Sequence, residues 1–123
     1  MVPLGENYTV GDLIKRLRCA VVVVARNRLG TINHTLLTVQ ALRKACIYRV
    51  KVVLMDAEPE GARAAHVDAS IASNPALLAE LLAPVPVLRL PFLGRNALCV
   101  TVVKKNRKKI KKTLARILDF ATV

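Results

Sequence analysis

Residues 20–44 read AVVVVARNRLGTINHTLLTVQALRK, and this stretch decides the fold. It opens with an unbroken apolar run over residues 20–25, which is rich in β-branched side chains and shows no polar alternation. Such runs are typical of strands that are buried on both faces of a parallel sheet. Apolar residues then recur every three to four positions, which predicts a helix. These residues are Ile32, Leu36, Val39 and Leu42.

The loop between these two elements is the leading candidate for a binding site. Its polar part, residues 26–28 (RNR), carries two arginines that either raise the local positive potential or are simply solvated. Gly30 allows the backbone to turn sharply, and Thr31 can cap the first free amide groups of the helix. A helix N-terminus at the carboxyl edge of a parallel sheet attracts carboxylates and phosphates. An ordinary capped helix after a strand has the same pattern, so both interpretations stay open.

A helix is predicted ahead of this stretch. Thr9 can cap a helix that starts at about Val10 and buries Leu13, Ile14 and Leu17. The helix would lead directly into the apolar run.

After this stretch, strand and helix patterns alternate with short loops. Two further strands are predicted over residues 50–55 and 85–90. Asn74 and Pro75 together predict the start of a helix, as an N-cap followed by proline at the first helical position. Alternation of this kind predicts an α/β fold with a three-layer, mainly parallel sheet and flanking helices.

The C-terminal segment concentrates the positive charge. The formal net charge is +12, and residues 104–119 hold eight basic residues and one acidic residue. Residues 97–103 fit either a last strand or the first part of a long helix, and residues 104–120 fit an amphipathic helix. Its predicted apolar stripe consists of Ile110, Leu114, Ile117 and Leu118. We expect the lysine-rich face to be solvated; binding of nucleic-acid phosphates is the alternative, and an anionic membrane surface is a weaker one.

Composition limits the class of protein. A chain of 123 residues fits one domain with a real core. Its cysteines, Cys19, Cys46 and Cys99, are widely spaced, which favours partly buried free thiols over disulfides or a zinc site. No signal-peptide pattern is visible and no apolar run is long enough to cross a bilayer, so we expect a cytoplasmic protein without a membrane span.

Residues 26–43, RNRLGTINHTLLTVQALR, resemble the strand–loop–helix of dethiobiotin synthetase. That family consists of ATP-dependent carboxylases of biotin biosynthesis with a P-loop fold. The resemblance runs from residue 1 to about residue 94 and concerns the second half of the family. We therefore expect a partial synthetase-like α/β domain over residues 1–103 and a basic helix over residues 104–123.

The resemblance implies roles for two groups of residues. In the family, the segment matching Leu29, Gly30, Thr31, Ile32 and Asn33 comes from the neighbouring subunit of a dimer and holds the carboxylate of diaminopelargonic acid. The second group is implied, more weakly, to lie near the adenine of ATP. It consists of Met55, where the family commonly has an asparagine, and of Pro91, Phe92 and Leu93. A thioether cannot replace the donor and acceptor of an asparagine amide, which puts nucleotide specificity in doubt.

The phosphate-binding loop of the family has no counterpart in the sequence, because no G-x-x-x-x-G-K-[ST] motif occurs. The main ligands of ATP and Mg²⁺ in the family are therefore expected outside this chain. No catalytic residue and no metal ligand is predicted. We expect a fragment or half of a synthetase-like protein, inactive alone, that works as a homodimer or with a separate P-loop-bearing half.

Overall fold

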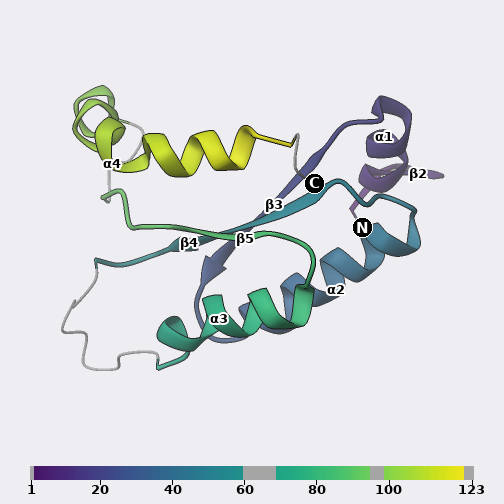
Figure 1. Cartoon of the computed structure of the whole chain (residues 1–123). Coiled ribbons are helices and arrows are strands. Elements are labelled where there is room, and N and C mark those ends of the chain that lie inside the picture. The colour runs from purple at the N-terminus through teal and green to yellow at the C-terminus, as the bar shows by residue number, and fades with distance from the viewer. Residues whose placement is uncertain (1, 60–68, 95–98, 121–123) are drawn as a thin grey trace.

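The structure is a computed structural model, and it describes residues 2–59, 69–94 and 99–120. Its centre is a three-stranded parallel sheet in the order β3-β4-β5. Helices α2 and α3 lie on one face of the sheet and α4 lies on the other (Figure 1). This arrangement confirms the predicted α/β class. The elements of this core are β3 (Val21–Asn27), α2 (Thr31–Lys44), β4 (Val50–Asp56), α3 (Ser70–Leu82), β5 (Val87–Leu90) and α4 (Val100–Leu118).

The N-terminal segment forms a small antiparallel ribbon, β1 (Pro3–Gly5) and β2 (Tyr8–Thr9), followed by α1 (Val10–Leu17). The predicted cap of α1 is confirmed, because the Asp12 amide donates to Thr9 Oγ1 at 3.3 Å and the Thr9 amide donates to Asp12 Oδ2 at 2.9 Å. The predicted burial of Leu13 and Leu17 is wrong, since they are 37% and 62% exposed. Only Ile14 of the predicted apolar side packs against the core.

The main core lies between the sheet and the helices α2 and α3. Val52 and Leu54 of β4 are fully buried there, together with Val39 of α2 and Leu78 of α3. The predicted α2 stripe is confirmed, because Leu42 is buried and Ile32 and Leu36 pack against the same cluster. Burial of each such aliphatic side chain contributes roughly 1.5–3 kcal/mol.

Strand β3 differs from the prediction because it lies at the edge of the sheet. Its residues are mostly half-buried, and Val24 is 60% exposed, so burial on both faces is wrong for this strand. The central strand β4 is the one that is buried on both faces. β3 also extends through Arg26 and Asn27, which were predicted to lie in the loop.

The face that carries α4 holds a smaller core. Ile117 of α4 is buried against Val53, Leu88 and Leu90 of the sheet, and Ile110 packs beside it. The other two residues of the predicted stripe, Leu114 and Leu118, are exposed at 41% and 76%. The helix predicted over residues 104–120 is confirmed as far as Leu118. Of the two alternatives left open for residues 97–103, the structure has the helix, which begins at Val100, and residues 97 and 98 lie outside the described part. The helix thus begins before the proposed domain boundary at residue 103, and that boundary stays a prediction.

Lys51 fixes the C-terminal end of α4 on the sheet. It is a buried residue of β4, 4% exposed, and its ammonium donates to the carbonyl oxygens of Arg116, at 2.6 Å, and of Asp119. The same ammonium lies 4.7 Å from the centre of the Phe120 ring. A lysine in this position satisfies helix-terminal carbonyls and interacts favourably with the helix dipole. None of the helices in the described ranges has the length and hydropathy of a membrane span.

Candidate functional site

The turn between β3 and α2 is built on Gly30, the N-cap residue of α2. Its φ of +84° lies in the left-handed region, which glycine adopts without strain. Thr31 is the first helical residue and makes no side-chain cap hydrogen bond, so its predicted role as the cap is wrong. Its amide donates instead to the Arg28 carbonyl at 3.2 Å, and the His34 amide donates to the Gly30 carbonyl at 3.4 Å. Among the amides of residues 31–34, those of Ile32 and Asn33 therefore stay available to an anion.

The five residues predicted to hold a carboxylate lie together on this first turn. Gly30 and Asn33 are exposed, Leu29 is 78% exposed, Ile32 is half-buried and Thr31 is buried. The surface of the turn thus presents backbone, one carboxamide and the positive end of the α2 dipole to solvent. Their role in binding stays a prediction.

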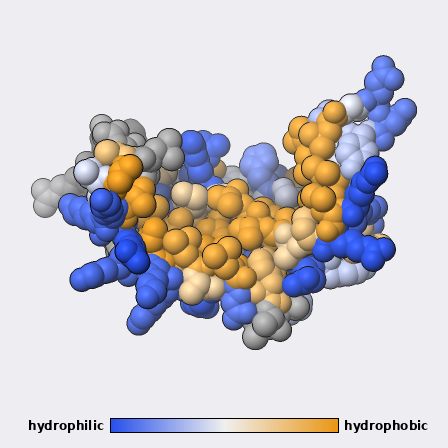
Figure 2. Space-filling model, turned by 90° about the horizontal axis from the view of Figure 1, so that it is seen from above, coloured by the Kyte–Doolittle hydropathy of each residue, from blue (hydrophilic) through white to orange (hydrophobic). Residues whose placement is uncertain are grey.

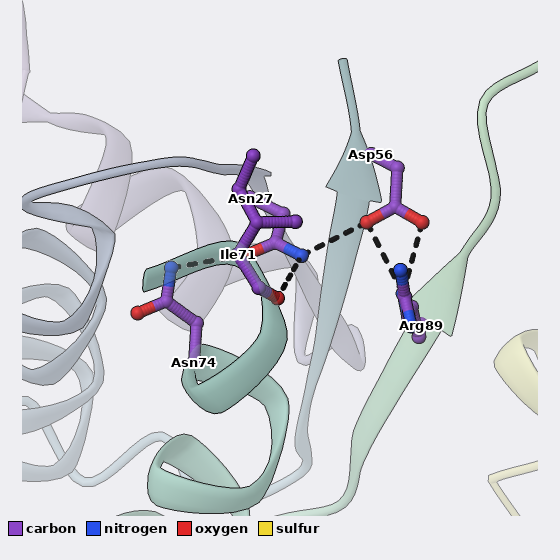
Figure 3. Close-up of polar contacts among 5 residues, drawn as sticks. All are labelled: Asn27, Asp56, Ile71, Asn74 and Arg89. Carbon is purple, nitrogen blue, oxygen red and sulfur yellow. Dashed lines mark hydrogen bonds and ion pairs between the residues drawn. The ribbon is translucent and has the colours of Figure 1, made fainter. Parts of the chain in front are cut away.

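A network of buried side-chain amides lies beside this turn, and Figure 3 shows its members Asn27 and Asn74. Asn74 Nδ2, from α3, donates to Asn27 Oδ1 at 3.0 Å and to the Arg28 carbonyl at 3.2 Å. Asn27 Nδ2 donates in turn to Asp56 Oδ1 at 2.9 Å and to the Ile71 carbonyl at 3.0 Å. Both asparagines are almost completely buried, at 1% and 2% exposure. The network therefore ties the ends of β3 and β4 and the start of α3 to the loop.

Pro75 explains why Asn27 can bind to a helix carbonyl. The structure places Pro75 inside α3, which begins at Ser70, so the predicted helix start at Asn74 and Pro75 is wrong. Proline has no N–H, and the carbonyl four residues earlier, that of Ile71, therefore lacks its usual helical donor. Asn27 supplies that donor. Sequence reasoning missed this network because the Asn-Pro pair matches an N-cap signal equally well.

Asp56 completes the network at the carboxyl edge of the sheet. The Arg89 guanidinium, from β5, donates through Nε to both carboxylate oxygens, at 2.9 and 3.1 Å (Figure 3). The half-buried Asp56 thus has partners in both neighbouring strands. Donors and acceptors in this cluster are directed at one another, which suits it to positioning the loop rather than to proton transfer.

A shallow cavity of about 280 Å³ lies beside the loop, between the edge of β3 and the first turns of α2. Thr35 is 2% exposed and its hydroxyl, which lines this region, has no hydrogen-bond partner. A buried hydroxyl without a partner costs roughly 1–3 kcal/mol. Other polar lining residues are Arg26, Arg28, Thr31, His34 and Thr38.

Two of the four residues predicted near the adenine, Met55 and Leu93, lie on the face of the sheet that α4 covers. Met55 and Leu93 both pack against the cluster that α4 covers, and Pro91 and Phe92 are half-buried beside Leu93 in the chain. Met55 pairs in register with Arg26, so it lies near the loop along the carboxyl edge. Its thioether offers no amide-like donor and acceptor pair to a base. Their nucleotide contacts stay a prediction.

Mg²⁺ has no evident ligand set in the described ranges. No group of three His, Cys, Asp or Glu residues there could hold a metal ion. The residues present do not fit the metal-bound nucleotide of the resembled family, so we assign no step through ATP or Mg²⁺ to this chain.

The three cysteines are free, as predicted, but all are exposed rather than partly buried. At Cys99 the hydrogen bond with the Thr101 hydroxyl, 3.1 Å away, lowers the pKa of the thiol.

Comparison with known proteins matched residues 1–91 to the family model described as AAA domain. The ATP-dependent dethiobiotin synthetase of Anaeromyxobacter sp. (strain K) is 40% identical over 92 residues, which are 75% of this chain and 39% of that protein. The enzyme of the same name from Endomicrobium trichonymphae is 57% identical over 44 residues, 36% of this chain and 20% of that protein. The one from Bacillus subtilis (strain 168) is 62% identical over 39 residues, 32% of this chain and 17% of that protein.

These alignments span well under half of the relatives' own length, between 17% and 39% in the three cases above. No solved structure matched the chain.

Proposed function

Because the chain belongs to the AAA domain family that includes the dethiobiotin synthetases, we propose that it serves as the substrate-holding part of a dethiobiotin synthetase-like protein. The activity implied by that resemblance converts diaminopelargonic acid, CO₂ and ATP into a cyclic urea. The part proposed for this chain is narrower: it binds the carboxylate of the diamine and fixes its position.

The observation that supports this role is the turn from Leu29 to Asn33. Its first-turn amides and the α2 dipole favour a carboxylate. The Asn33 carboxamide is exposed and can add a donor, and Arg26 and Arg28 are exposed nearby. The buried pair Asn27–Asn74 holds the preceding carbonyl, so the turn is positioned before a ligand arrives. Preorganisation of this kind reduces the entropic cost of binding.

The remaining parts of the proposed reaction come from outside the chain. The phosphate-binding loop, ATP and Mg²⁺ would be supplied by a P-loop-bearing polypeptide or by the corresponding part of a homodimer. Met55 and residues 91–93 would contribute at most an apolar wall near the base. We place the complete assembly in the cytoplasm.

The proposed site is tested by isothermal titration calorimetry, which measures the binding of diaminopelargonic acid and of its methyl ester to the full chain. We expect the acid to bind more tightly than the ester, because only the acid presents a carboxylate to the turn. Asn33→Ala should weaken binding of the acid severalfold, whereas Gln40→Ala, an exposed α2 residue away from the turn, should not. Equal binding of acid and ester would contradict the proposal.

Asn33→Ala also distinguishes binding of the diamine from binding of ATP when a P-loop-bearing partner is present. There Asn33→Ala should weaken binding of the diamine more than binding of ATP. Equal losses for both ligands would count against a carboxylate site at this turn.

A second candidate function concerns α4, which lies beyond the residues matched by the family. The helix contains no acidic residue, and its basic side chains with described positions are exposed. We propose nucleic-acid phosphates as its alternative ligand. Fluorescence anisotropy with a DNA duplex at several salt concentrations tests this, because each lost phosphate contact lowers the salt slope by about 0.9. Replacing Lys108 and Lys111 by Gln should lower this salt slope by about 2. Binding that does not depend on salt would exclude nucleic-acid phosphates as the ligand.

A further inference from the structure

A cavity of about 440 Å³ lies at the amino edge of the sheet, between the end of α1 and the connection from α2 to β4. Figure 1 shows these two segments at one end of the molecule, opposite the carboxyl ends of β3 and β4. Figure 2 shows hydrophilic residues toward both ends of the molecule and hydrophobic residues across its middle. None of the described residues that line the cavity belongs to β3, so its opening does not depend on the outer edge of that strand. Its lining residues with polar, charged or thiol side chains are Lys15, Arg18, Cys19, Cys46, Tyr48 and Arg49.

Two thiols share this cavity. Cys19 lies just after the end of α1 and Cys46 just after the end of α2, and both are free and exposed. The Cys46 backbone has a φ of +58°, in the left-handed region that residues other than glycine seldom adopt. The side-chain hydrogen bond with Cys46 raises the pKa of Tyr48, so the phenol lies against the Cys46 sulfur. Cys46 therefore has a neighbour in the cavity that can donate a hydrogen bond to a thiolate.

Three cations line the cavity together with the two thiols and give it a positive potential. Lys15, Arg18 and Arg49 are all exposed, and no carboxylate is among the described lining residues. The one ion pair within residues 2–59, 69–94 and 99–120 joins Arg89 to Asp56, so none of the three cations is in a salt bridge there. Two helices, α1 and α2, end at this cavity, and each helix C-terminus carries about half a negative charge. Three full positive charges exceed these two partial charges.

We propose that this cavity is an S-thiolation site, at which Cys46 forms a mixed disulfide with an anionic low-molecular-weight disulfide such as glutathione disulfide. The Cys46 thiolate attacks one sulfur atom of the reagent, and a new S–S bond forms as the S–S bond of the reagent breaks. The released glutathione leaves as a thiolate and takes up a proton from water. The reagent is itself the oxidant, so the step needs no other co-reactant. This site is separate from the proposed carboxylate site, and its chemistry does not depend on that site.

The charge of the cavity decides which disulfides react there. Glutathione disulfide carries a net negative charge at neutral pH, whereas 2-hydroxyethyl disulfide has the same reacting bond and no charge. Attraction by nearby cations raises the local concentration of the anionic reagent and hence its reaction rate. At a separation of ~8 Å in water, each cation changes that rate by roughly two- to threefold. Neutralising two of the three cations should therefore lower the rate by roughly fivefold.

The test compares the two reagents on the full chain. Mass spectrometry of its peptides gives the initial rate of mixed-disulfide formation at Cys46, and the ratio of the glutathione disulfide rate to the neutral rate removes the intrinsic reactivity of the thiol. Replacing Arg18 and Arg49 by Gln should lower this ratio about fivefold. Replacing Lys108 and Lys111 of α4 by Gln removes the same charge away from the cavity and should leave the ratio nearly unchanged. No change in the first double variant, or an equal fall in both, would overturn the proposal.

A second pair of substitutions keeps the test valid if the loss of Arg18, the left-handed C-cap of α1, disturbs that helix. Lys15→Gln with Arg49→Gln removes the same charge and should lower the ratio to the same extent. Cys19→Ser should leave thiolation of Cys46 unchanged, because Cys46 is the attacking thiol, whereas Cys46→Ser should abolish the adduct in the cavity. An adduct that forms on Cys19 at the same rate in the Cys46→Ser chain would overturn the assignment of the attacking thiol.

Discussion

The buried amide network makes a quantitative prediction about Asn74. Replacing Asn74 by Ala removes hydrogen bonds to Asn27, Arg28 and Ser70, with donor–acceptor distances of 3.0, 3.2 and 3.4 Å. Asn27 is only 1% exposed, so its Oδ1 would lose its donor in a place that water reaches poorly. A buried acceptor without a partner costs about 1–3 kcal/mol, and each further lost bond about 1 kcal/mol. We expect the free energy of unfolding to fall by about 3–5 kcal/mol.

The assay is urea denaturation followed by circular dichroism, with Asn106→Ala as the matched control. Asn106 is half-buried and donates a single hydrogen bond, to the Leu93 carbonyl at 2.7 Å, so its loss should cost about 1 kcal/mol. If Asn74→Ala costs no more than Asn106→Ala, the network does not hold the loop and the reasoning fails.

A charged variant separates hydrogen bonding from packing at the same position. Asn74→Asp keeps the shape of the side chain but cannot donate while ionised, and it faces two oxygen atoms, those of Asn27 and of the Arg28 carbonyl. At neutral pH it should therefore destabilise the fold more than Asn74→Ala does. Lowering the pH until the carboxyl group is protonated restores one donor and should recover part of the loss. The absence of such recovery would assign the effect to packing.

Three further predictions concern other polar contacts. Replacing Lys51 by Met removes its hydrogen bonds to the carbonyls of Arg116 in α4 and of Asp119, which follows the helix. In urea denaturation the free energy of unfolding should fall by about 2 kcal/mol, and the helical circular dichroism signal should decrease. Iodoacetamide at neutral pH should alkylate Cys99 faster than the other two cysteines, because the Thr101 hydroxyl and the amides of Thr101 and Val102 lower the pKa of its thiol. Thr101→Val removes the largest of these contributions and should reduce the difference. Hydrogen bonds from Thr9 lower the pKa of Asp12 below its ordinary value of 3.8. The stabilisation by this cap is therefore present above that pH and is lost as the pH falls through the lowered pKa. Asp12→Asn should abolish this pH dependence of the free energy of unfolding.

The elements of the fold could be predicted because their signals are local. The apolar run that forms β3 and the three-to-four-residue period of α2 both lie within short windows. The amide network could not be predicted in the same way, because Asn27 and Asn74 are 47 positions apart. Only the packing of α3 against the sheet brings them together. Asn74 then had a simpler local interpretation, as an N-cap, and the local pattern gave no reason to reject it.

The wrong burial predictions share a physical cause. Val24, Leu13 and Leu17 are apolar residues in patterns typical of buried faces, yet all three are exposed. Exposed apolar area is unfavourable at roughly 25 cal/mol per Å², so a sequence pattern of this kind indicates surface that is covered in the functional assembly. Val24 lies on the unpaired edge of β3, and Leu37, also exposed, lines the cavity beside the same strand. The disagreement between pattern and exposure at β3 therefore arises because no strand of the described residues pairs with its outer edge.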